Sequence, residues 1–260
     1  MKDSWRKYQR AWDIFKQLEL EISEFLAKEP VKIHVVESVP GKVEVKLERN
    51  QDIPIHFPLV IGELIHNARS SLDAATFQLV QNRHQGEMSF YEMGNIQYQI
   101  EDSWKKFSHK SRWHANQLDL VELVGISSQQ PFEFTKWLHQ ENQAEALKRA
   151  PLARLKAISN LDKHRNIKLL NLEPSMFMIL SGRDTTLGPS RFSQPPWENE
   201  DVIFTFTYTN PNMEAPTVKP EFSICFPEDA MPLNVRPVTL TLVEILNAVD
   251  LTLREFDQFD

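Results

Sequence analysis

The sequence predicts an α+β fold: a helical bundle with an N-terminal β-hairpin and a β-rich C-terminal half closed by a terminal helix. Before residue 170, several segments place apolar residues three or four positions apart, as on one face of a helix. After residue 170, short alternating apolar segments prevail until helical spacing returns near the end. Runs of strands separated from runs of helices favour α+β over a parallel βαβ fold. Residues 1–170, mainly helical with the hairpin, and residues 171–260, β-rich with the last helix, are expected to share one core.

Residues 4–28 are predicted to form an amphipathic helix, which Pro30 prevents from continuing. Its apolar stripe consists of Trp5, Tyr8, Trp12, Phe15, Leu18, Ile22 and Phe25. Such aromatic stripes usually pack into the core of their own chain. The alternative is an interface between two copies, which would make the protein a homo-oligomer.

The β-structure is predicted from alternation and turn residues. Residues 31–48 alternate on both sides of Pro40-Gly41, which is typical of a β-hairpin. A short extended segment is expected at 53–57, and later strands at 176–180, 202–208 and 221–226. Proline-rich loops are expected at 188–197 and 210–220.

The clearest helix is predicted over residues 59–82. Its stripe consists of Ile61, Leu64, Ile65, Ala68, Leu72, Ala75 and Leu79. Further helices are expected at 118–126, 133–146, 151–165 and 238–256. Residues 84–102 are ambiguous, because Ile96, Tyr98 and Ile100 alternate as they would in a strand.

Composition and charge exclude several classes of function. The chain of 260 residues has only seven glycines and no Gly-rich phosphate loop, so no cofactor is expected. The single cysteine, Cys225, cannot form an intramolecular disulfide and is expected to be buried in a strand. The polar N-terminus and the lack of an apolar run of roughly 18 residues predict a cytoplasmic protein without a membrane-spanning helix. The net charge of −7 argues against a nucleic-acid coat protein, yet the stretch 148–168 is strongly basic and could contact RNA.

Two predicted helices, at 59–82 and 151–165, carry charged residues beside their apolar stripes. In the first, His66, Arg69 and Asp73 are spaced i, i+3 and i+7, so they form one line next to the core face. In the second, Asp162 follows the apolar residue Ile158 by four positions, and Arg165 follows the apolar residue Leu161 by four positions. His164 lies on the other side of Leu161.

Charges at a core edge need partners, because an unpaired buried charge is costly. We therefore expect the two helices to pack together, with Arg69 paired to Asp162 and Arg165 paired to Asp73. In this interpretation the cluster is structural, and the protein is a binding or regulatory module.

The enzymatic alternative is a metal-independent ribonuclease. His66 or His164 would act as the base, and Arg69 or Arg165 would hold the phosphate, with Asp73 and Asp162 completing the site. A metal site is disfavoured, because the two arginines would repel a cation and the sequence has no HExxH motif. A serine or cysteine nucleophile is also disfavoured, because no GxSxG motif is present.

Two segments resemble a loosely defined group of uncharacterised bacterial proteins: His66-Asn-Ala-Arg-Ser-Ser-Leu-Asp73 and Asn160-Leu-Asp-Lys-His-Arg165. The intervening Ser128-Gln-Gln-Pro131 is also similar, and the resemblance covers about residues 55–170. It implies a bacterial or phage-associated origin and no particular activity.

A more distant resemblance is to HEPN domains, helical bundles that are often metal-independent ribonucleases. Their signature is an arginine followed after four to six residues by a histidine on the same helix. The literal match here, Arg49 to His56, contains Pro54 and is predicted to be turn and strand. His164-Arg165 has the same residue types in the reverse order.

Overall fold

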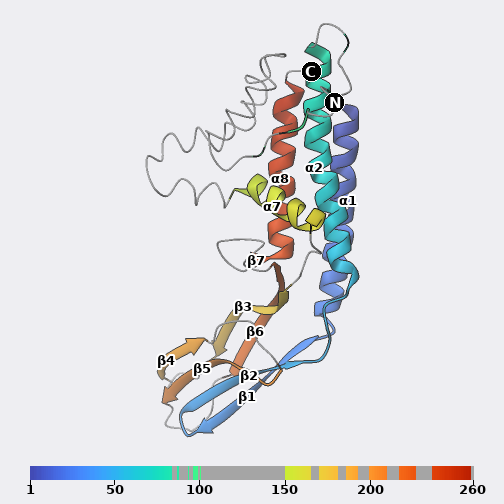
Figure 1. The fold of residues 1–260 in the computed structure, drawn as a ribbon. Coiled ribbons are helices and arrows are strands. Elements are labelled where there is room, and N and C mark those ends of the chain that lie inside the picture. The colour runs from blue at the N-terminus through green and yellow to red at the C-terminus, as the bar shows by residue number, and fades with distance from the viewer. Residues whose placement is uncertain are drawn as a thin grey trace, which may run out of the picture. The chain divides into compact units, whose positions relative to one another are not determined.

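The computed structural model describes residues 1–83, 87, 93, 96–98, 100, 150–164, 170–180, 186–192, 199–209, 217–226 and 236–258. The chain divides into two compact units. The first contains residues 1–18, 56–168 and 227–260, and the second contains residues 19–55 and 169–226. Both helices and antiparallel strands are present, so the fold is mixed α+β (Figure 1). The helices predicted at 118–126 and 133–146 lie outside the described residues.

The first unit is helical. Helix α1 (Lys2–Leu26) lies beside α2 (His56–Arg83) and α8 (Val238–Asp257), and α7 (Pro151–His164) packs against both α2 and α8 (Figure 1). Arg10 of α1 pairs with Glu63 of α2 at 2.8 Å. The indole nitrogen of Trp5 donates to Asp257 of α8 at 2.9 Å. These contacts join the first part of α1 to both of its neighbours.

The core of this unit consists of the stripes that helical spacing predicts. All seven stripe residues of α2 are buried. In α8 the apolar residues at helical spacing are buried as well: Leu242, Ile245, Leu246, Val249, Leu253 and Phe256. In α1 the buried stripe residues of this unit are Tyr8, Phe15 and Leu18, and Ile22 and Phe25, which belong to the second unit, are buried too. The prediction that this stripe packs within the chain is therefore confirmed for most of its length.

Helix α2 begins earlier than the sequence predicts. The extended segment expected at 53–57 is wrong at its end, because His56 and Phe57 already belong to the helix. Pro58 does not oppose this early start, since the first-turn amides of a helix have no intrahelical acceptor. Phe57 is almost fully buried, so its packing favours the helical conformation.

The second unit contains a four-stranded sheet. Strands β1 (Val31–Val39) and β2 (Lys42–Arg49) form the predicted hairpin, and Gly41 in the turn has φ +81°. Strand β2 also pairs with β5 (Val202–Thr209), which pairs with β4 (Thr186–Phe192), giving the order β1-β2-β5-β4. The structure thus groups the hairpin with the later strands, whereas the sequence placed it with the helical region 1–170.

Strand β4 corrects another prediction. Residues 188–192 were expected in a proline-rich loop, but they form the outer part of this sheet, with Ser190 opposite Phe206. Proline is tolerated on an edge strand, because the missing amide is not needed by a neighbouring strand. The sequence pattern therefore suggested a loop where the sheet has an edge.

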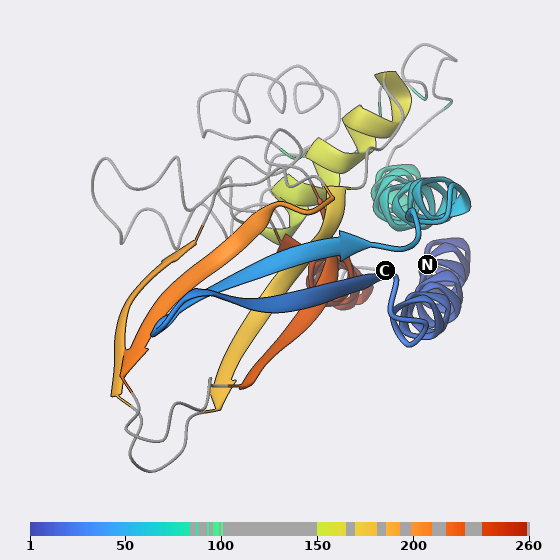
Figure 2. The same ribbon diagram turned by 90° about the horizontal axis from the view of Figure 1, so that it is seen from below.

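Strands β3 (Leu170–Leu180) and β6 (Thr217–Phe226) form a separate antiparallel pair (Figure 2). Cys225 lies in β6 and is buried, as predicted. A two-residue strand, β7 (Arg236–Pro237), immediately precedes α8. None of the helices within the described residues is both long enough and apolar enough to cross a membrane.

Candidate functional site

Arg69 and Asp73 form an ion pair on the outer edge of the α2 stripe. The guanidinium Nη2 lies 3.3 Å from Asp73 Oδ1, and Nε donates to Oδ2 at 3.4 Å. Residues four apart on a helix are neighbours, so this pair forms without any approach of a second element. The Arg69 side chain is 16% exposed and that of Asp73 is 33% exposed. Both residues therefore occupy the core-edge position that helical phase predicts.

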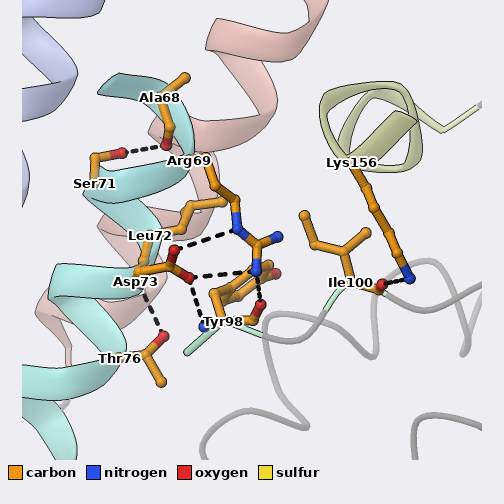
Figure 3. Close-up of polar contacts among 9 residues, drawn as sticks. All are labelled: Ala68, Arg69, Ser71, Leu72, Asp73, Thr76, Tyr98, Ile100 and Lys156. Carbon is orange, nitrogen blue, oxygen red and sulfur yellow. Dashed lines mark hydrogen bonds and ion pairs between the residues drawn. The ribbon is translucent and has the colours of Figure 1, made fainter. Parts of the chain in front are cut away.

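The pair holds the backbone of Tyr98 from both sides. The amide of Tyr98 donates to Asp73 Oδ1 at 2.9 Å, and its carbonyl oxygen accepts from Arg69 Nη2 (Figure 3). A buried backbone group needs a hydrogen-bond partner, and Tyr98 itself is not part of a strand. Side chains of α2 thus satisfy the groups that a β-ladder would otherwise satisfy.

Helix α7 holds the same segment two residues later. Lys156 extends from α7 and donates to the carbonyl oxygen of Ile100 at 2.6 Å (Figure 3). Tyr98 and Ile100 are both buried, and the Tyr98 ring packs edge-on against Phe256 of α8. The alternation expected for residues 96–100 therefore describes the buried side chains of Tyr98 and Ile100, although the described residues 96–98 and 100 form no strand.

Asp162 does not form the ion pair that the sequence predicts. Arg69 is bound to Asp73 and Tyr98, and the Asp162 carboxylate lies against Gly62 instead. A Cβ added to Gly62 would lie 2.5 Å from Asp162 Oδ1. The packing of α2 on α7 is thus confirmed, and at this point the Asp162 carboxylate occupies the space that a side chain at position 62 would need.

His66 is exposed rather than placed at the core edge. Its Nε2 lies 3.4 Å from the hydroxyl of Ser70, one turn further along α2. His164 is the last residue of α7, and its side chain lies outside the described part of the chain, as does the whole of Arg165. Of the six predicted site residues, the structure brings Arg69 and Asp73 into direct contact with each other.

An open groove lies beside this pair, between the start of the chain and the second half of α2. Its volume is about 820 Å³. Lys2 and Lys7 line one side, and Asp73, Gln78 and Gln81 line the other. Asp73, Phe77 and Gln81 are spaced four residues apart and share one face of the helix, so the groove follows α2 for more than two turns. The sequence contained these residues, but only the position of α1 makes them a groove.

The sequence analysis does not predict the two arginines that meet between α7 and α8. Arg154 and Arg236 both bind Glu244, one to each carboxylate oxygen. Arg154 belongs to the basic stretch 148–168, for which the sequence predicts exposed side chains that could contact RNA. The available signal was its position four residues before Ile158, which places it on the buried side of α7.

Within the described residues, no group of three or more His, Cys, Asp or Glu side chains is arranged to hold a metal ion. Comparison with known proteins found no matching family model, no matching curated protein and no matching solved structure.

Proposed function

We propose that this protein is a binding module in which the Arg69–Asp73 pair has a structural role and the adjacent groove receives the ligand. The observation that carries this proposal is that the side chains of Arg69 and Asp73 are already hydrogen-bonded to each other and to the backbone of Tyr98. Each Asp73 oxygen accepts a hydrogen bond, and Arg69 uses Nε and Nη2 for Asp73 and Tyr98. Side chains that are hydrogen-bonded to the protein's own backbone hold that backbone in place. Arg69 and Asp73 therefore have few hydrogen-bonding groups left for a substrate.

The groove has the size and chemistry of a ligand site. Pockets for small ligands usually enclose about 300–1,000 Å³, and the groove falls within this range. Gln78 and Gln81 offer amides that both donate and accept hydrogen bonds, while Lys2 and Lys7 offer positive charge and Asp3 offers negative charge. This combination suits a polar ligand with donors and acceptors of its own, such as a short extended peptide.

Disulfide capture tests whether the groove binds ligands. The only native cysteine, Cys225, is buried, so an introduced cysteine can be probed almost alone. Gln78→Cys places a thiol in the groove, and Lys16→Cys places one on an exposed part of α1 outside it. Both variants are incubated with the same library of disulfide-bearing amide and dipeptide fragments, and the adducts are measured by intact mass.

We expect Gln78→Cys to select a small subset of fragments and to retain them at higher reductant concentration. Lys16→Cys should label evenly across the library, because an exposed helix face offers no second contact. Equal yields and the same fragment ranking at both cysteines would contradict a ligand site in the groove.

A metal-independent ribonuclease is the second candidate function. It is favoured by the exposure of His66 and by the Asp162 carboxylate at Gly62, one helical turn from His66. His66 would act as the base, with His164, Arg69 or Arg165 completing the site. Against RNA contact along residues 148–168, Arg154 and Lys156 already bind groups within the chain.

The ribonuclease candidate is tested by incubating the full chain with total RNA in EDTA. His66→Ala is the matched variant, because His66 is exposed and its replacement leaves the Arg69–Asp73 pair intact. The binding-module proposal expects intact RNA with both proteins. Cleavage by the wild type that His66→Ala abolishes would replace that proposal with the enzymatic one.

A further inference from the structure

Two arginines from different elements converge on one carboxylate in the second turn of α8. Arg154 of α7 donates through Nη1 to Glu244 Oε2. Arg236 of β7 donates through Nη2 to Glu244 Oε1 at 2.9 Å. The three charged groups therefore carry a net charge of +1, and each guanidinium uses only one of its five N–H groups in this contact.

This excess charge is largely removed from solvent. The Arg154 side chain is 10% exposed and the Arg236 side chain is 28% exposed. Within the described part of the chain, no second carboxylate pairs with either guanidinium. A sheltered charge without a partner is costly, and proteins normally neutralise it with a counter-charge.

The electrostatics around Arg154 indicate the same excess. Burial lowers the pKa of Arg154, and the positive charge of Arg236 lowers that pKa further, against the opposing effect of Glu244. The bond to Glu244 therefore does not fully compensate Arg154 for its burial and for the second guanidinium.

The first turn of α8 lies one turn before Glu244 and supplies no negative charge to offset this excess. Its N-cap residue, Pro237, makes no side-chain capping hydrogen bond, and the first turn contains no acidic residue. The free amides of a helix N-terminus carry partial positive charge and commonly bind anions.

We infer that Arg154 and Arg236 form a binding site for a phosphate-type oxyanion, to which the partial positive charge of the α8 N-terminus, one turn away, adds. Arginine matches the planar edge of such an anion through paired N–H groups, which Lys cannot do. Glu244 holds the two guanidiniums apart and in register, so it positions the site and also competes with the incoming anion. This site is separate from the proposed groove, and it requires neither the binding proposal nor the ribonuclease candidate.

Calorimetry on the full chain, at constant ionic strength in chloride, tests the inference. The probes are inorganic phosphate and ribose 5-phosphate. Arg236→Gln should weaken phosphate binding by about tenfold or more, because it removes charged hydrogen bonds to the anion. Arg254→Gln is the matched control: Arg254 lies on α8, is 68% exposed and pairs with Asp250 alone, so its replacement should leave phosphate binding unchanged.

Glu244→Gln gives a readout of the opposite sign. Removing the competing carboxylate raises the net charge of the cluster from +1 to +2, so phosphate should bind more tightly than to the wild type. A purely structural triad would show no such gain. Should Glu244→Gln fail to fold, the comparison of Arg236→Gln with Arg254→Gln still decides the question.

The two probes distinguish the source of the phosphate group. Equal affinity for both indicates a site for the free ion, and tighter binding of ribose 5-phosphate indicates a site for the phosphate of a larger molecule. Absence of binding by the wild type to either probe, or equal binding by Arg236→Gln and the wild type, would overturn the inference.

Discussion

Replacing Asp73 by alanine is the strongest single test of the clamp on Tyr98. The variant removes the acceptor of the Tyr98 amide and the partner of Arg69 at the same time. Tyr98 itself is untouched, and its ring can keep its contact with Phe256. The substitution therefore measures the polar contacts of the clamp without creating a large cavity.

The expected loss follows from these two contacts. A hydrogen bond to a charged group contributes about 1.5–3 kcal/mol, and Asp73 accepts such a bond from the Tyr98 amide at 2.9 Å. The ion pair with Arg69 adds about 0.2–1 kcal/mol, discounted because the Asp73 side chain is one-third exposed. Alanine offsets about 0.5 kcal/mol of this through its higher helix propensity. We expect Asp73→Ala to lower the free energy of unfolding by about 1–3.5 kcal/mol.

Urea unfolding followed by far-UV circular dichroism measures this change, and hydrogen exchange of the Tyr98 amide localises it. Glu63→Ala is the control, because Glu63 also lies on α2 and pairs with an arginine, but at the exposed surface. Its loss should cost less than about 1 kcal/mol and should leave Tyr98 protected from exchange. If Asp73→Ala changes stability by less than about 0.5 kcal/mol and the Tyr98 amide stays protected, the clamp does not exist as described.

Two further predictions concern helix packing and ionisation. Gly62→Ala should lower the melting temperature although alanine favours helix, because its Cβ would lie 2.5 Å from Asp162 Oδ1. Gly62→Ala/Asp162→Ala should restore it, and a single variant as stable as the wild type would contradict the contact. Burial raises the pKa of Tyr8 above 10.0, and Asp250 raises it further, while the hydrogen bond from Trp12 lowers it. The folded protein therefore holds this proton more tightly than the unfolded chain, so the stabilisation is complete below about pH 10 and is lost as pH rises through the folded pKa. In alkaline denaturant titrations, Tyr8→Phe should lose less stability than the wild type, and parallel curves would refute this assignment.

The helices were predictable because their signal is local. The stripe of α2 is read from residues three or four apart, and all seven of its members are buried. The sheet was not predictable to the same degree. Val43, Val45 and Leu47 alternate in a way that identifies the inward face of β2, and all three are buried. That pattern does not identify β5 as the partner strand, because the pairing of Val45 with Phe204 joins distant parts of the chain.

The candidate site was predictable in position but not in its partners. Helical phase places Arg69 and Asp73 at the edge of the core, where the structure has them. The expected partner of Arg69 was Asp162, because an argument from charged side chains considers only other charged side chains. Pairing charged side chains with one another leaves out the carbonyl oxygen of Tyr98, which accepts a hydrogen bond from Arg69. A buried carbonyl needs a donor as much as a buried cation needs an acceptor.

The expected link between α2 and α7 therefore exists in an indirect form. Arg69 and Asp73 bind the backbone of Tyr98, and Lys156 of α7 binds the backbone of Ile100, so residues 98 and 100 bridge the two helices. Direct ion pairs would have required four charges to match across the interface. A backbone segment between the helices offers donors and acceptors along its length. The charged side chains of each helix can therefore form hydrogen bonds to this segment independently of the other helix. Charges placed at a core edge thus predict that polar contacts will join neighbouring elements, while the identity of the contacts depends on which backbone lies between them.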